Sequence, residues 1–154
     1  MITLRPGNPD DFDHILAWRN APAAVQYSKR GRQVTHEEEY PKYAAALKGT
    51  DPVCKVMIAC IPPETPIGYV RFDLQPSGLE AEVNIALDPA QHGKGHGTEI
   101  LKQGCAYAFD HYGIKRLTAI IMRENIASVK VFTKAGFTYV TDDGTFATYE
   151  LRKQ

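Results

Sequence analysis

The chain has 154 residues, the size of one ordinary domain, and its 18 Lys and Arg residues balance its 18 Asp and Glu residues, so the formal net charge at pH 7 is zero. This balance gives no sign of a nucleic-acid or membrane partner, and the lack of a long apolar span or a signal-peptide core favours a cytoplasmic protein. Three cysteines without CxxC spacing, Cys54, Cys60 and Cys105, argue against a disulfide framework and a zinc site.

The first third of the chain predicts one strand and two helices. Ile2 to Arg5 has the pattern of a short strand, and a helix follows that starts at Asn8-Pro9-Asp10-Asp11 and runs to about Asn20. Residues 21–34 have no clear period, so we expect a loop or a broken helix there. Thr35 to Glu38 forms a capping box, which predicts a second helix to about Lys48.

The middle of the chain predicts an antiparallel meander. Val53 to Ile61 and Pro66 to Leu74 have strand character and are joined by a Pro-rich turn. Residues 79–87 alternate strictly between apolar and mostly polar side chains, so the third strand has one apolar and one polar face. Asp88-Pro89 ends this strand.

The last third predicts a helix, a buried strand, a second helix and a hairpin. The helices are expected at Thr98 to Tyr112 and at residues 126–135, with the buried strand at Ile114 to Met122 between them. Phe137 to Thr141 and Thr145 to Arg152 then form a hairpin around Asp-Asp-Gly.

A glycine-rich heptapeptide, Gln91 to Gly97, lies between the third meander strand and the next helix. Alternate glycines allow several backbone N–H groups to converge on one anion where the helix begins, as in a phosphate-binding loop. A nucleotide-hydrolysing P-loop is excluded, because Lys94 is followed by Gly95 and not by Ser or Thr. A dinucleotide-binding fold is excluded as well, because the loop does not follow the first strand of the chain.

The segment His92-Gly93-Lys94-Gly95-His96-Gly97 resembles the pyrophosphate loop of the GNAT superfamily of acyl-CoA-dependent N-acyltransferases. His92 stands where the family usually has Gln or Arg. A second segment, Asn125 to Ser128 with Phe132 and Lys134-Ala-Gly-Phe137, is similar to the family's other cofactor segment at its usual distance. The resemblance implies an α/β (α+β) fold with a mixed, largely antiparallel sheet of about six to seven strands, flanked by about four helices, in a single domain over residues 1–154.

The resemblance implies acetyl-CoA as the cofactor, and the residues themselves give no sign of a metal site. His92, His96 and His111 have no carboxylate at a spacing that suits metal binding. The pyrophosphate would lie at the glycine loop, and the pantetheine arm would pair with the strand ending at Leu87. The implied cofactor-binding residues are Ile85, Ala86, Leu87, His92, Gly93, Lys94, Gly95, His96, Gly97, Thr98, Asn125, Ser128, Phe132 and Lys134.

Acyl transfer to an amine requires a base for the amine and a proton for the leaving thiolate. Glu82, on the polar face of the third meander strand, is the candidate base; Glu80 is a weaker alternative, and Asn84 could hold a water molecule. Phe132 occupies the place of the family's usual tyrosine acid, which leaves Ser128 or a water molecule as the proton source. Asn125 is the third catalytic candidate, through its amide. No cysteine falls on a motif position, which favours direct attack in a ternary complex over an acyl-enzyme.

The acceptor site is expected at Trp18-Arg19-Asn20, because a similar triplet occurs in relatives that acetylate nucleotide-linked amino sugars. The expected partner is therefore a small-molecule amine. An N-terminal acetyltransferase of ribosomal or other proteins is the alternative enzyme, and a non-catalytic acyl-CoA-binding sensor is the alternative from another class. A homodimer is expected from the resemblance alone.

Overall fold

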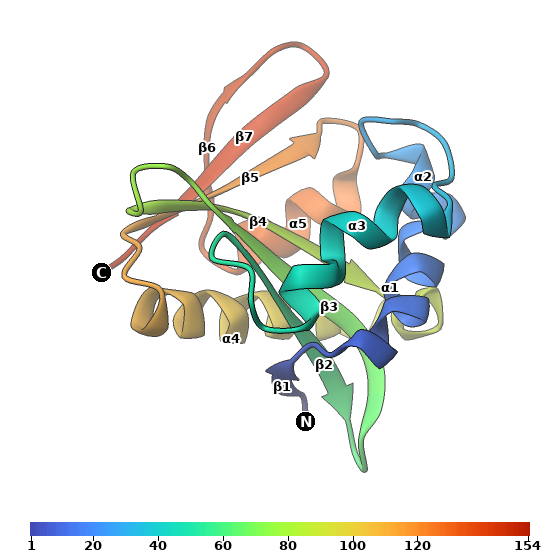
Figure 1. Ribbon diagram of the computed structural model, residues 1–154. Coiled ribbons are helices and arrows are strands. Elements are labelled where there is room, and N and C mark those ends of the chain that lie inside the picture. The colour runs from blue at the N-terminus through green and yellow to red at the C-terminus, as the bar shows by residue number, and fades with distance from the viewer.

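One mixed sheet of seven strands organises the chain, as the computed structural model of residues 1–154 shows (Figure 1). Its strands are β1 (Thr3–Pro6), β2 (Cys54–Ile61), β3 (Thr65–Leu74), β4 (Glu80–Leu87), β5 (Arg116–Met122), β6 (Thr138–Asp142) and β7 (Phe146–Arg152), in the order β1-β2-β3-β4-β5-β7-β6. The helices are α1 (Phe12–Arg19), α2 (Pro22–Gln26), α3 (His36–Leu47), α4 (His96–His111) and α5 (Ile126–Lys134), with 3-10 turns η1 (Pro9–Asp11) and η2 (Pro89–Gln91).

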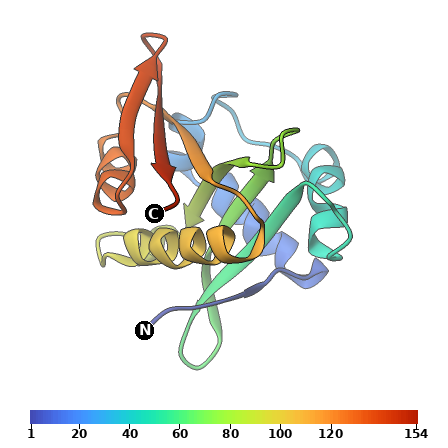
Figure 2. The ribbon, with the colours of Figure 1, turned by 90° about the vertical axis from the view of Figure 1, so that its left-hand side faces the viewer.

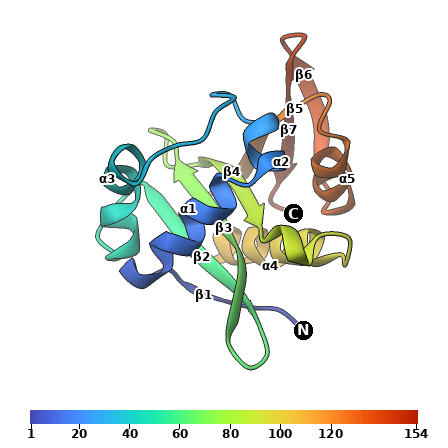
Figure 3. The same cartoon turned by 90° about the vertical axis from the view of Figure 1, so that its right-hand side faces the viewer.

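Helices cover both faces of the sheet. In Figure 2 the helix α4 crosses in front of the strands, and in Figure 3 α1 and α3 lie on the opposite face. The apolar residues divide between these two layers. Val70, Phe72, Val83 and Leu101 belong to a core on the α4 side, while a second core of 11 buried residues gathers α1, α3 and the other faces of β2 and β3.

Strand alternation explains how the sheet serves two cores. On β3, Val70 and Phe72 are fully buried toward α4, whereas Tyr69 packs among residues of α1 and α3. The polar positions Arg71 and Asp73 share the face of Tyr69. The register aligns Arg71 with Asn84 and Asp73 with Glu82, so four polar side chains meet on one face of β3 and β4.

The predicted mixed sheet and flanking helices are confirmed, with small differences at the ends of elements. The segment 21–34 contains the short helix α2, so there are five helices where about four were expected. Helix α4 begins at His96, two residues before the predicted start, because the glycine loop ends directly in its first turn. None of the helices combines the length and the apolar character needed to cross a membrane.

Candidate active site

The sheet opens between β4 and β5, its only parallel neighbours. Their pairing is limited to three positions, from Glu80 opposite Arg116 to Glu82 opposite Thr118. Beyond these positions β5 continues to pair with β7 as far as Met122, and β4 continues to pair with β3 as far as Leu87. The two strands therefore diverge, and the sheet contains a wedge-shaped opening at its centre.

Unpaired backbone groups of β4 face this opening. The N–H of Asp88 donates to the Ile67 carbonyl on the β3 side, and the Leu79 carbonyl accepts from Lys115 on the β5 side, both at 2.7 Å. The β3–β4 register is continuous, so odd-numbered residues of β4 direct their backbone groups toward β5. Ile85 and Leu87 have no strand partner there and can pair with an extended ligand.

Ala86 was expected to pair with the pantetheine arm together with Ile85 and Leu87, but its backbone faces the other way. Its backbone faces β3 and is aligned with Tyr69, so it is not free to pair with a ligand in the opening. The side chain of Ala86 nevertheless lines the cavity at the opening. The sequence predicts the strand correctly. The direction of each N–H group of β4 depends on which residues pair with β3 and which face β5, and this register is not visible in the sequence.

The glycine loop places helix α4 with its N-terminus next to the end of β4. Gly93 and Gly95 have φ angles of 78° and 79°, a left-handed conformation that favours glycine, and Gly95 is the residue before the helix. No side chain caps the helix, so the first N–H groups, from His96 to Thr98, remain available to an anion. Lys94 is exposed and contacts Gln91 through its Nζ at 3.4 Å. This loop can hold a phosphate group.

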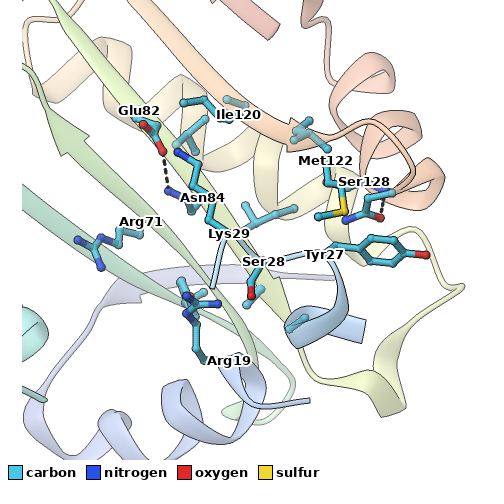
Figure 4. A pocket seen from close by; sticks show the side chains of 18 of the residues that line it. Arg19, Tyr27, Ser28, Lys29, Arg71, Glu82, Asn84, Ile120, Met122 and Ser128 are labelled. Atoms are coloured by element: carbon cyan, nitrogen blue, oxygen red, sulfur yellow. Dashed lines mark hydrogen bonds between the residues drawn. The ribbon is translucent and has the colours of Figure 1, made fainter. Parts of the chain in front are cut away.

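A cavity of about 420 Å³ occupies the opening and extends over the α1 and α3 side of the sheet. Glu82 and Asn84 project into it from β4, as Figure 4 shows, and the Asn84 amide donates to Glu82 Oε2 at 3.5 Å. Asp73, the cross-strand neighbour of Glu82, pairs with Arg71 at 3.0 Å. Glu82 is therefore the carboxylate of this pair that has no cationic partner.

The α5 side of the cavity contains three of the predicted residues. Asn125 caps α5, because its Oδ1 accepts from the Ser128 N–H at 3.2 Å, and the Ser128 hydroxyl lines the cavity without a hydrogen bond. Phe132 is 3% exposed and packs edge-on against Phe137, so its ring serves mainly as core at the cavity wall. Lys134 lies outside the cavity, exposed near the end of α5.

Only Arg19 of the predicted acceptor triplet lines the cavity. Trp18 is 5% exposed and stacks between His14 and Tyr69, so it is a core residue and does not reach the cavity. The side chain of Asn20 makes two hydrogen bonds with the backbone of Val34. The Asn20 amide donates to the Val34 carbonyl, and Asn20 Oδ1 accepts from the Val34 N–H, both at 2.8 Å. Asn20 thereby closes the base of the segment 21–34.

The sequence did not single out several residues that line the cavity. They come from the segment 21–34, from α3 and from β3: Tyr27, Ser28, Lys29, Glu39, Lys42, Tyr43, Tyr69, Arg71 and Asp73. Alternation along β3 could have indicated Arg71 and Asp73, since both share a face with Tyr69. The residues of 21–34 had no comparable signal, because a segment without period gives no facing direction.

Burial controls the ionisation of several groups in the two cores. The pKa of Tyr69 is raised well above its usual value by burial and by the neighbouring Tyr43, so its hydroxyl stays protonated. Burial also raises the pKa of Cys54 and of Cys105 to about 12, which keeps both thiols neutral. No group of three or more His, Cys, Asp or Glu side chains lies close enough together to hold a metal ion.

Comparisons with known proteins give a family model and several relatives of this chain. The sequence model of the Acetyltransferase (GNAT) domain matches residues 1–138. A mycothiol acetyltransferase of Salinispora tropica is 24% identical over 144 residues, which are 88% of this chain and 44% of that protein. An N-acetyltransferase 9-like protein of Nematostella vectensis is 33% identical over 73 residues, 47% of this chain and 36% of that protein. The chain thus spans less than half the length of these relatives.

Solved structures share the fold over nearly the whole chain. An aminoglycoside acetyltransferase, AAC(6')-Ib in complex with coenzyme A, superposes with a TM-score of 0.81 at 19% identity, covering 99% of this chain and 95% of that one. A spermidine N-acetyltransferase of Vibrio cholerae in complex with CoA and spermine superposes with a TM-score of 0.77 at 18% identity. The match covers 98% of this chain and 95% of that one. These matches confirm the fold that the resemblance implied.

Proposed function

This chain belongs to the GNAT family of acetyl-CoA-dependent acetyltransferases, and we propose from that premise that it transfers the acetyl group to a primary amine of a small molecule. The observation that carries the proposal is the opening between β4 and β5. On one strand it combines Glu82, a carboxylate without a cationic partner, with the backbone of Ile85 and Leu87, which has no strand partner on the β5 side; the glycine loop then leads from this strand to α4. We treat residues 1–154 as one catalytic domain.

The residues present fit an acyl-CoA molecule. The N–H groups of Ile85 and Leu87 can pair with the amides of an extended pantetheine arm, as an added strand would. The free N–H groups of the first turn of α4 and the partial positive charge there suit the pyrophosphate, and Gly93 and Gly95 leave open space for its approach. When bound, acetyl-CoA supplies an activated acetyl thioester.

Glu82 is the proposed base. An alkyl amine has a pKa of about 10 and is mostly protonated at neutral pH, so a group must take its proton before it can attack. Glu82 can take that proton directly, or through a water molecule that Asn84 helps to hold. Arg71 balances the charge of the adjacent Asp73, which leaves the Glu82 carboxylate free for this purpose.

Ser128 is the proposed proton source for the leaving thiolate, with a water molecule as the alternative. Its hydroxyl lines the cavity without a partner, and Phe132 beside it has no proton to give. Asn125 then acts by holding the first turn of α5, and its free amide nitrogen can reach toward the cofactor arm. The high pKa values of Cys54 and Cys105 support direct attack by the amine over a covalent enzyme intermediate.

We propose an amino sugar nucleotide as the acceptor to test first, since Arg19 lines the cavity and a guanidinium suits phosphate groups. The N-terminal amine of a protein is the alternative. It is less favoured, because a cationic peptide would need an acidic groove and this cavity has more basic than acidic side chains. The named acceptors of the structural neighbours, an aminoglycoside and spermine, define two further groups to include. A homodimer stays a prediction.

The decisive experiment is release of free CoA thiol from acetyl-CoA across a panel of amino sugar nucleotides, aminoglycosides, polyamines and short peptides. Release that depends on one class of amine supports the enzyme and identifies its branch. Tight binding of acetyl-CoA without release on any amine would favour the sensor module instead. The same assay on Glu82→Gln separates turnover from binding.

A further inference from the structure

The cavity is positively charged although the chain as a whole is neutral. Its lining contains five basic side chains, Arg19, Lys29, Arg30, Lys42 and Arg71, and three acidic ones, Glu39, Asp73 and Glu82. An excess of basic groups in a partly enclosed space attracts anions and repels cations, because low-dielectric walls focus the field into the cavity. The charge of the lining is therefore informative about the charge of the ligand.

Most of these charges neutralise one another. Glu39, 4% exposed, accepts through Oε1 from Arg30 at 2.8 Å and from Lys42 at 3.2 Å. Arg71 pairs with Asp73 at 3.0 Å. The contacts of Glu39 join the segment 21–34 to α3, and the pair of Arg71 and Asp73 lies within β3. These three cations are therefore already paired with acidic side chains of the protein.

Arg19 and Lys29 are the two cations left without an acid. Arg19 is half-buried at the end of α1 and makes neither a hydrogen bond nor an ion pair with the protein. Lys29 has only the ring of Phe146, 6.0 Å away, as a partner. A guanidinium offers five N–H donors, and the protein itself uses none of those of Arg19. Both side chains are thus available to a ligand.

The two free cations come from other elements than the proposed base. In Figure 4, Arg19 and Lys29 come from α1 and the segment 21–34, whereas Glu82 and Asn84 come from the sheet. A ligand whose amine lies at Glu82 can therefore extend toward Arg19 and Lys29 in the same cavity. Arg19 marks an end of the cavity that suits an anion, and the side chain of Lys29 extends from the segment 21–34 toward Asn84 and Glu82.

We propose that the amine acceptor carries an anionic group, a phosphate or a carboxylate, which Arg19 and Lys29 bind while the amine lies at Glu82. This inference rests on the amine acetylation proposed above and narrows its substrate class. Arg19 can contact two oxygens of such a group at once, and Lys29 adds a mobile point charge. Polyamines and aminoglycosides have the wrong sign of charge for this end of the cavity.

The test compares amines that carry an anionic group with amines that lack one. Among amino sugars, glucosamine is compared with its 6-phosphate and with a nucleotide-linked amino sugar. Amino acids are compared with their carboxamides, and spermidine represents the polycations. CoA release should be faster with the anionic member of a pair, by about ten- to hundredfold in kcat/KM. The phosphate and carboxylate pairs distinguish the two kinds of anion. Added salt should reduce the preference by screening.

Variants assign the preference to the two cations. Arg19→Ala and Lys29→Ala should each raise KM for the anionic acceptor about tenfold or more, without changing the dissociation constant of acetyl-CoA. Arg19→Lys keeps the charge but loses the two-oxygen contact, so it should recover part of the loss. Lys48→Ala, at an exposed position after α3, is the matched control and should behave as the unmodified protein.

The outcomes separate this inference from the function it rests on. If no amine of either kind releases CoA, the acetyltransferase proposal fails. If neutral and anionic members react equally, or if spermidine reacts fastest, the enzyme stands and the anionic acceptor is refuted. An unchanged preference in Arg19→Ala and Lys29→Ala would refute their assignment as its cause.

Discussion

Glu82 differs from the neighbouring carboxylates in having no cation to hold it. Asp73 has Arg71, and Glu80 contacts Arg116 at 3.4 Å, whereas Glu82 accepts only a 3.5 Å contact from Asn84. We expect Glu82→Gln to lower kcat by about 10² to 10⁴, the usual contribution of a general base, because the amide cannot take a proton. Steady-state kinetics with a reactive amine measure the loss, and calorimetric titration should find acetyl-CoA binding intact.

Glu80→Gln is the matched control, since Glu80 lies on the same face of β4 two residues earlier. It should keep nearly full activity. A large loss in Glu80→Gln with little loss in Glu82→Gln would move the base to the position that the sequence ranked second.

Gly95 is the residue at which the phosphate loop turns into α4. Its φ of 79° disfavours any other residue, and no atom lies within 4 Å of an added Cβ, so Gly95→Ala introduces backbone strain without a clash. The left-handed conformation costs an alanine about 1–2 kcal/mol, and relief of that strain should shift the loop and raise the dissociation constant of acetyl-CoA about tenfold. Fluorescence or calorimetric titration measures the change.

Gly78→Ala provides the comparison for Gly95→Ala. Gly78 has a φ of 74° and equally open surroundings, but it lies in the turn between β3 and β4. Both variants should lose similar stability, and only Gly95→Ala should lose cofactor affinity. Equal affinity loss in the two would mean that the effect is general destabilisation.

The candidate site could be predicted where a residue's function follows from its local sequence. Glycines before a helix imply a phosphate loop, and alternation along β4 identifies the face of Glu82. Trp18 could not be assigned from its neighbour Arg19, because the two adjacent side chains of a helix point in different directions. Its spacing from Phe12 and Ile15, three residues each time, was the available signal that Trp18 belongs to the buried stripe.

At the scale of elements, the segment 21–34 forms the acceptor side of the cavity and is closed by Asn20. The two hydrogen bonds between Asn20 and Val34 join the ends of the segment. Because Val34 is 4% exposed, its backbone groups have little access to water. Asn20→Ala leaves both groups without partners. We expect a loss of about 1–3 kcal/mol, and a KM for the amine raised several-fold because Tyr27 to Arg30 are less well held.

Thermal unfolding and kinetics with each substrate check the Asn20→Ala variant. The expected pattern is a lower Tm, a higher KM for the amine and an unchanged KM for acetyl-CoA. Gln33→Ala, which removes one exposed 3.3 Å contact to the Asn20 carbonyl, should change little. A rise in KM for acetyl-CoA in Asn20→Ala would contradict a function limited to the acceptor side.

The elements themselves could be predicted because their signals are local. The capping box at Thr35 and Glu38 is present as two hydrogen bonds, at 3.2 and 2.8 Å, and α3 begins next to it. The partner of Asn20 and the early end of β4–β5 pairing are contacts between distant parts of the chain. No local pattern encodes them, since they depend on how the whole sheet is assembled.

At the scale of the whole molecule, the sheet can open between β4 and β5 because the core on the α4 side includes residues of both strands, among them Val83 and Leu117. Strands β1 to β4 form an antiparallel unit, β5 to β7 form another, and three positions of parallel pairing join them. Helix α4 packs on β3 and β4 and also contacts α5, so it bridges the two units where the sheet does not. A long parallel pairing of β4 and β5 would close the space that the cofactor needs.

Carboxylates with lowered pKa values, in several parts of this molecule, make its stability sensitive to acid. Hydrogen bonds from Arg32 and from the Thr35 N–H lower the pKa of Glu38 to about 2, and the N–H groups of Cys54 and Val53 lower the pKa of Asp51. Burial opposes ionisation of Asp11, but the hydrogen bonds from Arg5 and Asn8 outweigh it and also lower its pKa. Each of these groups is a stronger acid in the folded chain than in the unfolded chain.

A carboxylate with a lowered pKa stabilises the fold at every pH above its unfolded value, about 4 to 4.5, and this contribution is lost as the pH falls toward the folded value. We therefore expect Tm to be nearly constant from pH 7 to pH 5 and to fall steadily between pH 4.5 and pH 2. Calorimetric scans at a series of pH values across this range measure the change in Tm. Glu38→Gln should flatten part of the decline, because glutamine keeps the hydrogen-bonding pattern of the capping box but does not titrate. A Tm that rises on acidification, or a decline unchanged in Glu38→Gln, would show that the ion pairs of α3 do not contribute to folding as their geometry indicates.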